Sequence, residues 1–326
     1  MFKQLFRNRI YESRKLKYRI RDLDEFVWRN RTRSEPSIVR GLARSWGSQG
    51  SIELGSFEYG GNSFELLAEF YQLATHGPPY VKVKDKVFVN SEEIEYETEF
   101  GDLAFIVDYW LENELLSRKI SLLQSKKEMA TDKVKIELHQ QYLMQFWPDL
   151  EFTQGTTLPA QRFRFQGASP DEFSFYHFIL SEHRNPTYSS GVCSVPFIGP
   201  AIGTDRATIE KSLRDWVDKR KTEPKTGPPS RILSLPLEPG RIYKHGESYE
   251  WNLLPKPLTQ FILDAAYQNV GTDCSEIVKI AFARVENIIA LKIAGGREGH
   301  KLRNQYKDIY ESRHVGNDQK EKVEWT

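Results

Sequence analysis

The sequence has few cysteines and no long apolar run. Its 326 residues include two cysteines, Cys193 and Cys274, which are too few for a disulfide framework and lack the paired spacing of a zinc site. No stretch approaches the roughly 20 consecutive apolar residues of a membrane-spanning helix, and the start "MFKQLFRNRIYESRK" has no apolar core of a signal peptide. These absences predict a soluble, cytoplasmic protein.

Several familiar catalytic motifs are also missing. The sequence contains neither the GxSxG nucleophile elbow of serine hydrolases nor the HExxH zinc motif. The stretch "GGREGHK" at 295–301 is not a phosphate-binding loop, because His300 separates the last glycine from the lysine.

Composition indicates a globular protein with a basic beginning. Hydrophobic residues make up 39% of the chain and aromatic residues 13%, enough to build cores in roughly two domains. The net charge is only +1, yet residues 1–45 contain thirteen Lys or Arg against five acids. Arg14, Lys15 and Lys17 in this basic arm are candidates for contacting nucleic-acid phosphates. The alternative is a solvated helical face, or an arm packed on acids of the same chain.

Two apolar segments near the middle of the sequence predict a hairpin. Residues 102–109 and 119–126 are rich in Ile, Leu, Val and Phe, and the connecting "WLENELLSR" has a polar centre. In an antiparallel hairpin centred near residue 113 paired positions sum to about 226, which sets Asp102 opposite Gln124 to within about two residues. Because strand side chains alternate, Gln124 and Lys126 share a face. We therefore expect an acid, an amide and an ammonium group to converge.

Such a convergence suits a divalent metal ion and a scissile phosphate. Asp102 and the side-chain oxygen of Gln124 are hard ligands for Mg²⁺. Lys126 can orient or deprotonate an attacking water and offset phosphoryl charge. Taken one at a time, the three residues have simpler interpretations as an acid at a strand start, a surface amide and a lysine that extends to solvent.

The expected order of elements resembles a known family. It resembles the αβββαβ core of the PD-(D/E)xK restriction-endonuclease-like superfamily, and "GDLAFIVDY…ISLLQSKK" looks most like its Mrr-type branch, in which QxK replaces (D/E)xK. The elements that carry this resemblance are a helix at 63–76, strands at 81–89, 102–109 and 119–126, a helix at 130–146 and a strand at 150–153.

The resemblance implies roles for particular residues. Asp102 would be the metal-binding acid, Gln124 the second metal ligand and Lys126 the catalytic lysine, with Mg²⁺ or Mn²⁺ as cofactor. The glutamate that the family carries on its first helix would fall on Glu69 or Glu65, and Glu69 is favoured because it lies deeper in the expected helix.

Two departures from the family pattern stand close to Asp102. Phe100 and Gly101 occupy the place where the family usually has a proline, and an acidic run at 92–99 makes Glu99 a candidate extra ligand, although a solvated edge-strand charge is the simpler interpretation. On the expected second helix, Gln141 is a weak candidate for contact with nucleic acid.

The predicted organisation has three parts. A basic N-terminal extension (1–59) precedes a nuclease-like catalytic core (60–154) and a C-terminal mixed α/β accessory domain (155–326). In the accessory domain we expect helices at 170–182, 206–221, 257–270 and 275–292 and strands at 161–166 and 231–237.

The predicted function is that of a metal-dependent nuclease. It would hydrolyse phosphodiester bonds, with DNA as the expected substrate, and the resemblance implies a bacterial or phage-defence context. The C-terminal domain could bind a second copy of the chain or a partner protein. One alternative is a catalytically inactive nuclease-like module that binds nucleic acid or protein, and another is an adaptor with no contact to nucleic acid.

Overall fold

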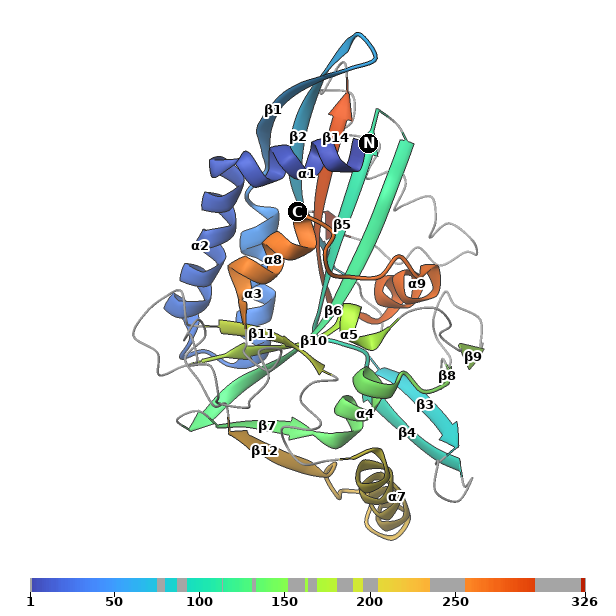
Figure 1. Ribbon diagram of the computed structural model, residues 1–326. Helices are drawn as coiled ribbons and strands as arrows, with labels where there is room; N and C mark the ends of the chain where they lie inside the picture. Colours follow the sequence, from blue (N-terminus) through green and yellow to red (C-terminus); the bar gives the residue numbers. More distant parts are fainter. Residues whose placement is uncertain are drawn as a thin grey trace, which may run out of the picture.

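The computed structural model describes residues 2–74, 80–86, 93–112, 114–130, 133–151, 162–163, 169–180, 190–195, 205–234, 256–296 and 324–325. It shows a mixed α/β protein built on a large twisted sheet with helices on both sides (Figure 1). Within these residues no helix is both long and apolar enough to cross a membrane.

The elements are distributed along the whole chain. The helices are α1 (Phe2–Glu12), α2 (Arg14–Asn30), α3 (Glu35–Gly47), α4 (Leu138–Phe146), α5 (Pro170–Phe173), α7 (Arg206–Thr222), α8 (Leu258–Ala266) and α9 (Ser275–Arg284). The strands are β1 (Ser51–Tyr59), β2 (Asn62–Ala74), β3 (Tyr80–Lys86), β4 (Glu93–Glu99), β5 (Leu103–Leu111), β6 (Glu114–Ala130), β7 (Lys133–Glu137), β8 (Leu150–Glu151), β9 (Arg162–Phe163), β10 (Ser174–Ile179), β11 (Ser190–Ser194), β12 (Ser230–Ser234), β13 (Lys256–Pro257), β14 (Asn287–Gly296) and β15 (Glu324–Trp325).

The large sheet combines strands from all three predicted parts of the chain. Its main path runs β1-β2-β14-β5-β6-β10-β11-β13, and β7, β12 and β15 pair alongside this path. Strand β14 is antiparallel to β2 and parallel to β5, while β10 is parallel to β6. A smaller sheet has the order β4-β3-β8-β9. The hairpin β5–β6 therefore lies near the middle of the sheet.

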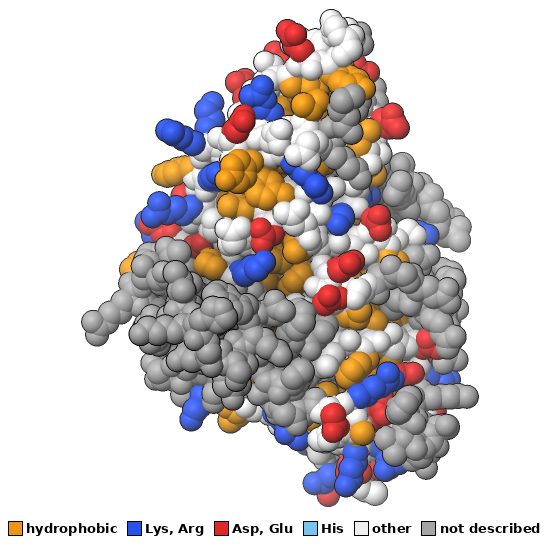
Figure 2. Space-filling view, in the orientation of Figure 1, with side chains coloured by type: hydrophobic (Ala, Val, Ile, Leu, Met, Phe, Trp, Pro, Cys, Tyr) orange, Lys and Arg blue, Asp and Glu red, His pale blue; other side chains and the backbone are white. Residues whose placement is uncertain are grey.

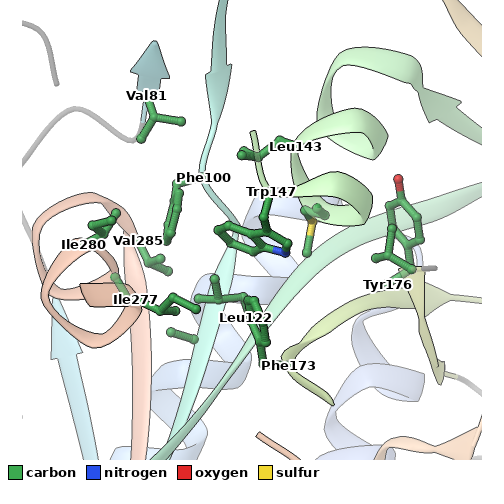
Figure 3. Close-up of a cluster of buried hydrophobic side chains, with 14 of the residues drawn as sticks. Val81, Phe100, Leu122, Leu143, Trp147, Phe173, Tyr176, Ile277, Ile280 and Val285 are labelled. Atoms are coloured by element: carbon green, nitrogen blue, oxygen red, sulfur yellow. The ribbon is translucent and has the colours of Figure 1, made fainter. Parts of the chain in front are cut away.

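Two apolar cores cover the two faces of the large sheet. Helices α1, α2, α3 and α8 pack on one face (Figure 1), where Trp46 contacts Phe70 and Phe105 edge-on and donates from Nε1 to the Ala290 carbonyl at 2.9 Å. On the other face, α4, α5 and α9 contribute to the cluster in Figure 3, in which Phe100 and Phe173 pack against Trp147. Both faces of β5 and β6 are therefore fixed by packing.

The expected helix over 63–76 is wrong, because residues 62–74 form strand β2. Gly60 and Gly61 have φ of 59° and 76° and close a two-residue hairpin in which Tyr59 pairs with Asn62. Glycine adopts such positive φ values without steric cost, and a Gly-Gly pair is a strong hairpin signal. Pairing with β1 and β14 overrides the helical spacing of the leucines.

Other expected elements are partly correct. The helix expected at 130–146 begins only at Leu138, because "KVKIE" alternates buried and exposed residues as β7, and it ends before Trp147 and Pro148 as predicted. The helices expected at 170–182 and 275–292 stop at Phe173 and Arg284, and strands β10 and β14 follow them. Helix α7 and strand β5 occur within about two residues of the expected bounds, whereas α8 ends at Ala266 rather than at 270 and β6 extends beyond 119–126 at both ends. Residues 87–89 and 152–153 lie outside the described part of the chain.

Candidate active site

The base of the β5–β6 hairpin brings Asp102 and Gln124 into contact. Leu103 pairs with Leu123, and the pairing follows the predicted register as far as Tyr109 and Ser117, after which the register shifts. Nε2 of Gln124 donates to Oδ2 of Asp102 at 2.5 Å, and the backbone N–H of Ser125 donates to the same oxygen at 2.7 Å. The register inferred from the sequence therefore places the acid and the amide together.

Lys126 lies two residues further along the same face of β6 and is held by α4. Its Nζ donates to Oε1 of Gln140 at 2.7 Å, and Nε2 of Gln140 donates in turn to Oε2 of Glu99 at 3.1 Å. Oε2 of Glu137 is 4.0 Å from Nζ of Lys126. Only 8% of Lys126 and 3% of Gln140 is exposed. The lysine is therefore a buried, oriented group rather than a solvated one.

Glu35, at the start of α3, joins the site from the N-terminal helices. Its Oε2 accepts a hydrogen bond from the backbone N–H of Lys127 at 2.9 Å, and its charge influences Asp102. Sequence reasoning did not identify this residue. The signal that could have found it is "SEPS" at 34–37, a serine followed by an acid and a proline, which is typical of a helix N-terminus.

The carboxyl groups of the site resist ionisation. Burial raises the pKa of Asp102 to about 8; the ammonium group of Lys126 opposes the rise, and the nearby Glu35 and Glu99 add to it. Burial also raises the pKa values of Glu35 and Glu99, again against the effect of Lys126. Three acids around one lysine leave the site with more potential negative charge than it can neutralise by itself.

The structure does not bring Glu69 or Glu65 to this site. Both lie on strand β2, and Oε2 of Glu69 is 3.2 Å from Nζ of Lys292 on β14. Lys292 pairs in turn with Asp108, six residues along β5 from Asp102 and therefore roughly 20 Å away. The Glu69 assignment failed because it depended on a helix that does not form.

A row of alternating charges explains why Glu69 is buried. It crosses four neighbouring strands at one level, from Glu69 to Lys292, Asp108 and Arg118, and all four side chains are buried or nearly so. Arg118 donates to the Asp108 carboxylate at 2.7 and 2.5 Å. Each of these charges thus has an oppositely charged neighbour on the next strand. The row therefore stabilises the sheet and does not belong to the candidate site.

The remaining predicted binding residues also lie apart from Asp102. Gln141 is fully buried and donates to Gln145 at 3.0 Å, whereas its neighbour Gln140 reaches the site. Arg14 and Lys15 are exposed at the first turn of α2 and Lys17 lies over the Tyr11 ring. These basic residues lie at the start of α2, and Glu35 comes after its end. The helix has 17 residues and is about 24 Å long, so the two groups lie at opposite ends of it. In Figure 2, the left-hand surface, where Figure 1 places α2, shows basic side chains interspersed with acidic ones.

The described residues of the site offer only part of the ligand set that a divalent metal ion needs. Oε1 of Gln124 is buried and has no hydrogen-bond partner among the described residues; rotation of the amide would direct this oxygen to the side where Asp102 and Glu99 lie. Within the described part of the chain, no three Asp, Glu, His or Cys side chains are grouped closely enough to hold a metal ion unaided. The oxygen atoms present fit Mg²⁺ as a partial ligand set, which water and a substrate phosphate would complete.

Comparison of the chain with protein-family models, with curated proteins and with solved structures found no match. The candidate active site is therefore defined by its own geometry. That geometry unites Asp102, Gln124 and Lys126 with three residues from other elements, Glu35, Glu99 and Gln140.

Proposed function

We propose that the chain is a metal-dependent nuclease that hydrolyses phosphodiester bonds, with DNA as its substrate and Mg²⁺ or Mn²⁺ as its cofactor. The observation that carries the proposal is the grouping of Asp102, Gln124 and Lys126 on one face at the base of the β5–β6 hairpin. An acid, a free amide oxygen and a buried lysine are the groups that phosphodiester hydrolysis needs.

The chain order of the elements around the site supports the proposal. Helix α3, strands β2, β5 and β6, helix α4 and strand β10 occur along the chain in the αβββαβ order of the PD-(D/E)xK superfamily, with β1, β3, β4, β7, β8, β9 and α5 between them. In this alignment Glu35 on α3 takes the place first assigned to Glu69. The sheet differs from a simple three-strand meander in one respect, because β14 lies between β2 and β5.

The side chains of the site have separable tasks in this proposal. Asp102, Gln124 and Glu99 would hold the cation, which when bound supplies positive charge to the phosphate and lowers the pKa of a bound water. With a pKa near 8, Asp102 retains its proton at neutral pH and must release it to act as a ligand. Gln140 fixes Nζ of Lys126 through a 2.7 Å hydrogen bond, so the lysine meets the attacking water in a defined position.

An inactive nuclease-like binding module is the second candidate function. Its supporting observation is that Asp102 and Lys126 are already engaged by Gln124 and Gln140, and that the described acids do not form a complete metal site. Such a module would keep the polar network for folding alone and would bind nucleic acid or protein elsewhere.

Gln124 variants separate the two functions. Gln124→Glu adds a negative charge with little change in shape, so under the nuclease proposal it binds Mn²⁺ more tightly without substrate and retains cleavage. Gln124→Leu loses both. Calorimetric titration of Mn²⁺ into the wild type and both variants, beside a DNA cleavage time course, makes the comparison. A Leu variant as active as the wild type would remove Gln124 from the mechanism.

A further inference from the structure

Strand β14 begins beside the candidate active site. Nδ2 of Asn287, the first residue of β14, donates to the carbonyl oxygen of Asp102 at 3.2 Å, and only 6% of Asn287 is exposed. The pKa of Glu99 is raised mainly by burial, and the charge of Glu286, the residue before Asn287, adds to the rise. A residue of the segment predicted to be an accessory domain therefore contacts the site.

The contact supplies a partner to a main-chain group at the end of a strand. The pairing of β5 begins at Leu103, which is opposite Leu123 on β6 and opposite Asn287 on β14. Asp102 comes one residue earlier. Its N–H donates to the Leu123 carbonyl at 3.0 Å, and its carbonyl accepts from the Asn287 side chain. The main chain of Asp102 is thus held from both neighbouring strands, in keeping with the need of main-chain polar groups for partners.

The start of β14 is itself fixed by the core. Val285 caps helix α9, where its N–H donates to the Ala281 carbonyl at 2.9 Å, and its side chain is fully buried. Phe100, two residues before Asp102, is also fully buried, and both side chains belong to the cluster drawn in Figure 3. The segments that lead to Asn287 and to Asp102 are therefore anchored in one core, and the hydrogen bond joins two fixed points.

The direction of the Asp102 carboxyl group depends on this main-chain anchor. Oδ2 of Asp102 accepts from Nε2 of Gln124 and from the N–H of Ser125. Because the aspartate side chain is short and adopts few rotamers, a displaced main chain would move the carboxyl group away from both donors.

We propose that Asn287 is a positioning residue, which fixes the direction of the Asp102 carboxyl group by holding the Asp102 carbonyl. The effect of Asn287 on metal binding and cleavage rests on the proposed nuclease function. Its effect on the Asp102 carboxyl group does not, and this difference allows the two to be tested apart.

Two substitutions separate positioning from simple loss of stability. Asn287→Leu is close to asparagine in shape and removes the amide donor. Trp46→Phe is the matched control, because it removes another side-chain N–H that donates to a strand carbonyl, that of Ala290 on β14. The control leaves the contacts of Asp102 in place. If Asn287→Leu does not fold, Asn287→Ala, which also removes the donor, replaces it.

Hydrogen exchange of two amides on β6, measured by NMR in EDTA, reports the position of the carboxyl group. The Ser125 N–H donates to Oδ2 of Asp102 at 2.7 Å, and the Lys127 N–H donates to Oε2 of Glu35 at 2.9 Å. A general loss of stability accelerates both amides alike. In Asn287→Leu we expect the ratio of the Ser125 rate to the Lys127 rate to rise about tenfold, and in Trp46→Phe we expect it to stay at the wild-type value.

Mn²⁺ titration and DNA cleavage measure the consequence for the proposed reaction. Outer partners of metal ligands typically contribute about 10–100-fold to metal affinity or activity. Asn287→Leu should therefore weaken Mn²⁺ binding and lower kcat within this range while KM for DNA changes little. Trp46→Phe, assayed at a temperature at which it is folded, should keep the wild-type Mn²⁺ affinity and kcat.

The outcomes distinguish the positioning role from the nuclease proposal. An unchanged ratio of the two amide rates in Asn287→Leu, or an equal rise in Trp46→Phe, would overturn the positioning role even if the wild type cleaves DNA. A selective rise in Asn287→Leu, beside a wild type that neither binds Mn²⁺ nor cleaves DNA, would support the positioning of Asp102 and refute the nuclease. Wild-type Mn²⁺ affinity and kcat in folded Asn287→Leu would overturn the role of Asn287 in the reaction.

Discussion

Replacing Asp102 with Asn tests the buried charge at the centre of the candidate site. The hydrogen bonds that the Asp102 side chain accepts from Gln124 and from the Ser125 backbone end on the same oxygen, Oδ2. An Asn side chain has one carbonyl oxygen that can accept both. The substitution therefore removes the ionisable group while retaining shape and hydrogen bonding.

The expected gain in stability depends on pH. The pKa of Asp102 rises from 3.8 to about 8 on folding, so the folded protein keeps a proton that the unfolded chain releases, and stability falls as the pH rises from about 4 to about 8. At 1.36 kcal/mol per pKa unit the loss is at most about 5 to 6 kcal/mol. Partial exposure and screening reduce it, and we expect Asp102→Asn to be more stable than the wild type by about 1–3 kcal/mol near pH 9.

Urea unfolding in EDTA at about pH 5 and about pH 9 measures this difference. Asp108→Asn is the matched control, because it removes a buried acid whose partner, Arg118, then loses its carboxylate; it should destabilise the protein by about 3 kcal/mol at both pH values. If the advantage of Asp102→Asn does not grow from pH 5 to pH 9, the carboxyl group is not held in the unfavourable environment that the structure shows.

Three further substitutions test other parts of the account. Trp46→Ala should cost about 3–5 kcal/mol in urea unfolding, because it empties a buried ring site and removes the hydrogen bond to Ala290; a cost below about 1 kcal/mol would contradict that packing. Lys292→Met should cost about 3 kcal/mol or more, because it leaves the buried carboxylate of Glu69 without the ammonium group that lies 3.2 Å from it, and an unchanged stability would contradict the charge row. Gln140→Leu should lower kcat for DNA cleavage more than it changes KM, because it releases Lys126; an unchanged kcat would show that the hydrogen bond is dispensable.

The centre of the site could be predicted because hairpin geometry is local. Two apolar strands joined by a short polar turn have few possible registers. The position of the turn therefore placed Asp102 opposite Gln124. Alternation then set Lys126 on the same face. Adjacent residues in one sequence segment carried all the information that this part of the site required.

The rest of the site could not be predicted because it comes from distant segments. Glu35 lies 92 positions before Lys127, to whose backbone it is hydrogen bonded, and Gln140 stands beside the equally plausible Gln141 on one helix. A one-residue difference on a helix turns a side chain by about 100°, so the choice between the two glutamines depends on how α4 docks.

The helical interpretation of residues 63–76 shows how local propensity can mislead. Leu66, Leu67 and Glu69 are good helix formers, yet β2 lies between β1 and β14, and β14 is more than 200 residues away in the sequence. Such long-range pairing has no signature in the segment itself. The Gly60–Gly61 turn was the one local signal that opposed the helix.

Cleavage of DNA is the most direct test of the proposed function. Plasmid, linear duplex and single-stranded DNA would be incubated with the wild type, Asp102→Ala and Lys126→Ala, each with Mg²⁺ or Mn²⁺ and with EDTA. The account predicts metal-dependent cleavage by the wild type, none in EDTA, and loss of cleavage in both variants while circular dichroism shows them folded. Cleavage by both variants at near wild-type rate, or none by the metal-loaded wild type on any of the three substrates, would contradict it.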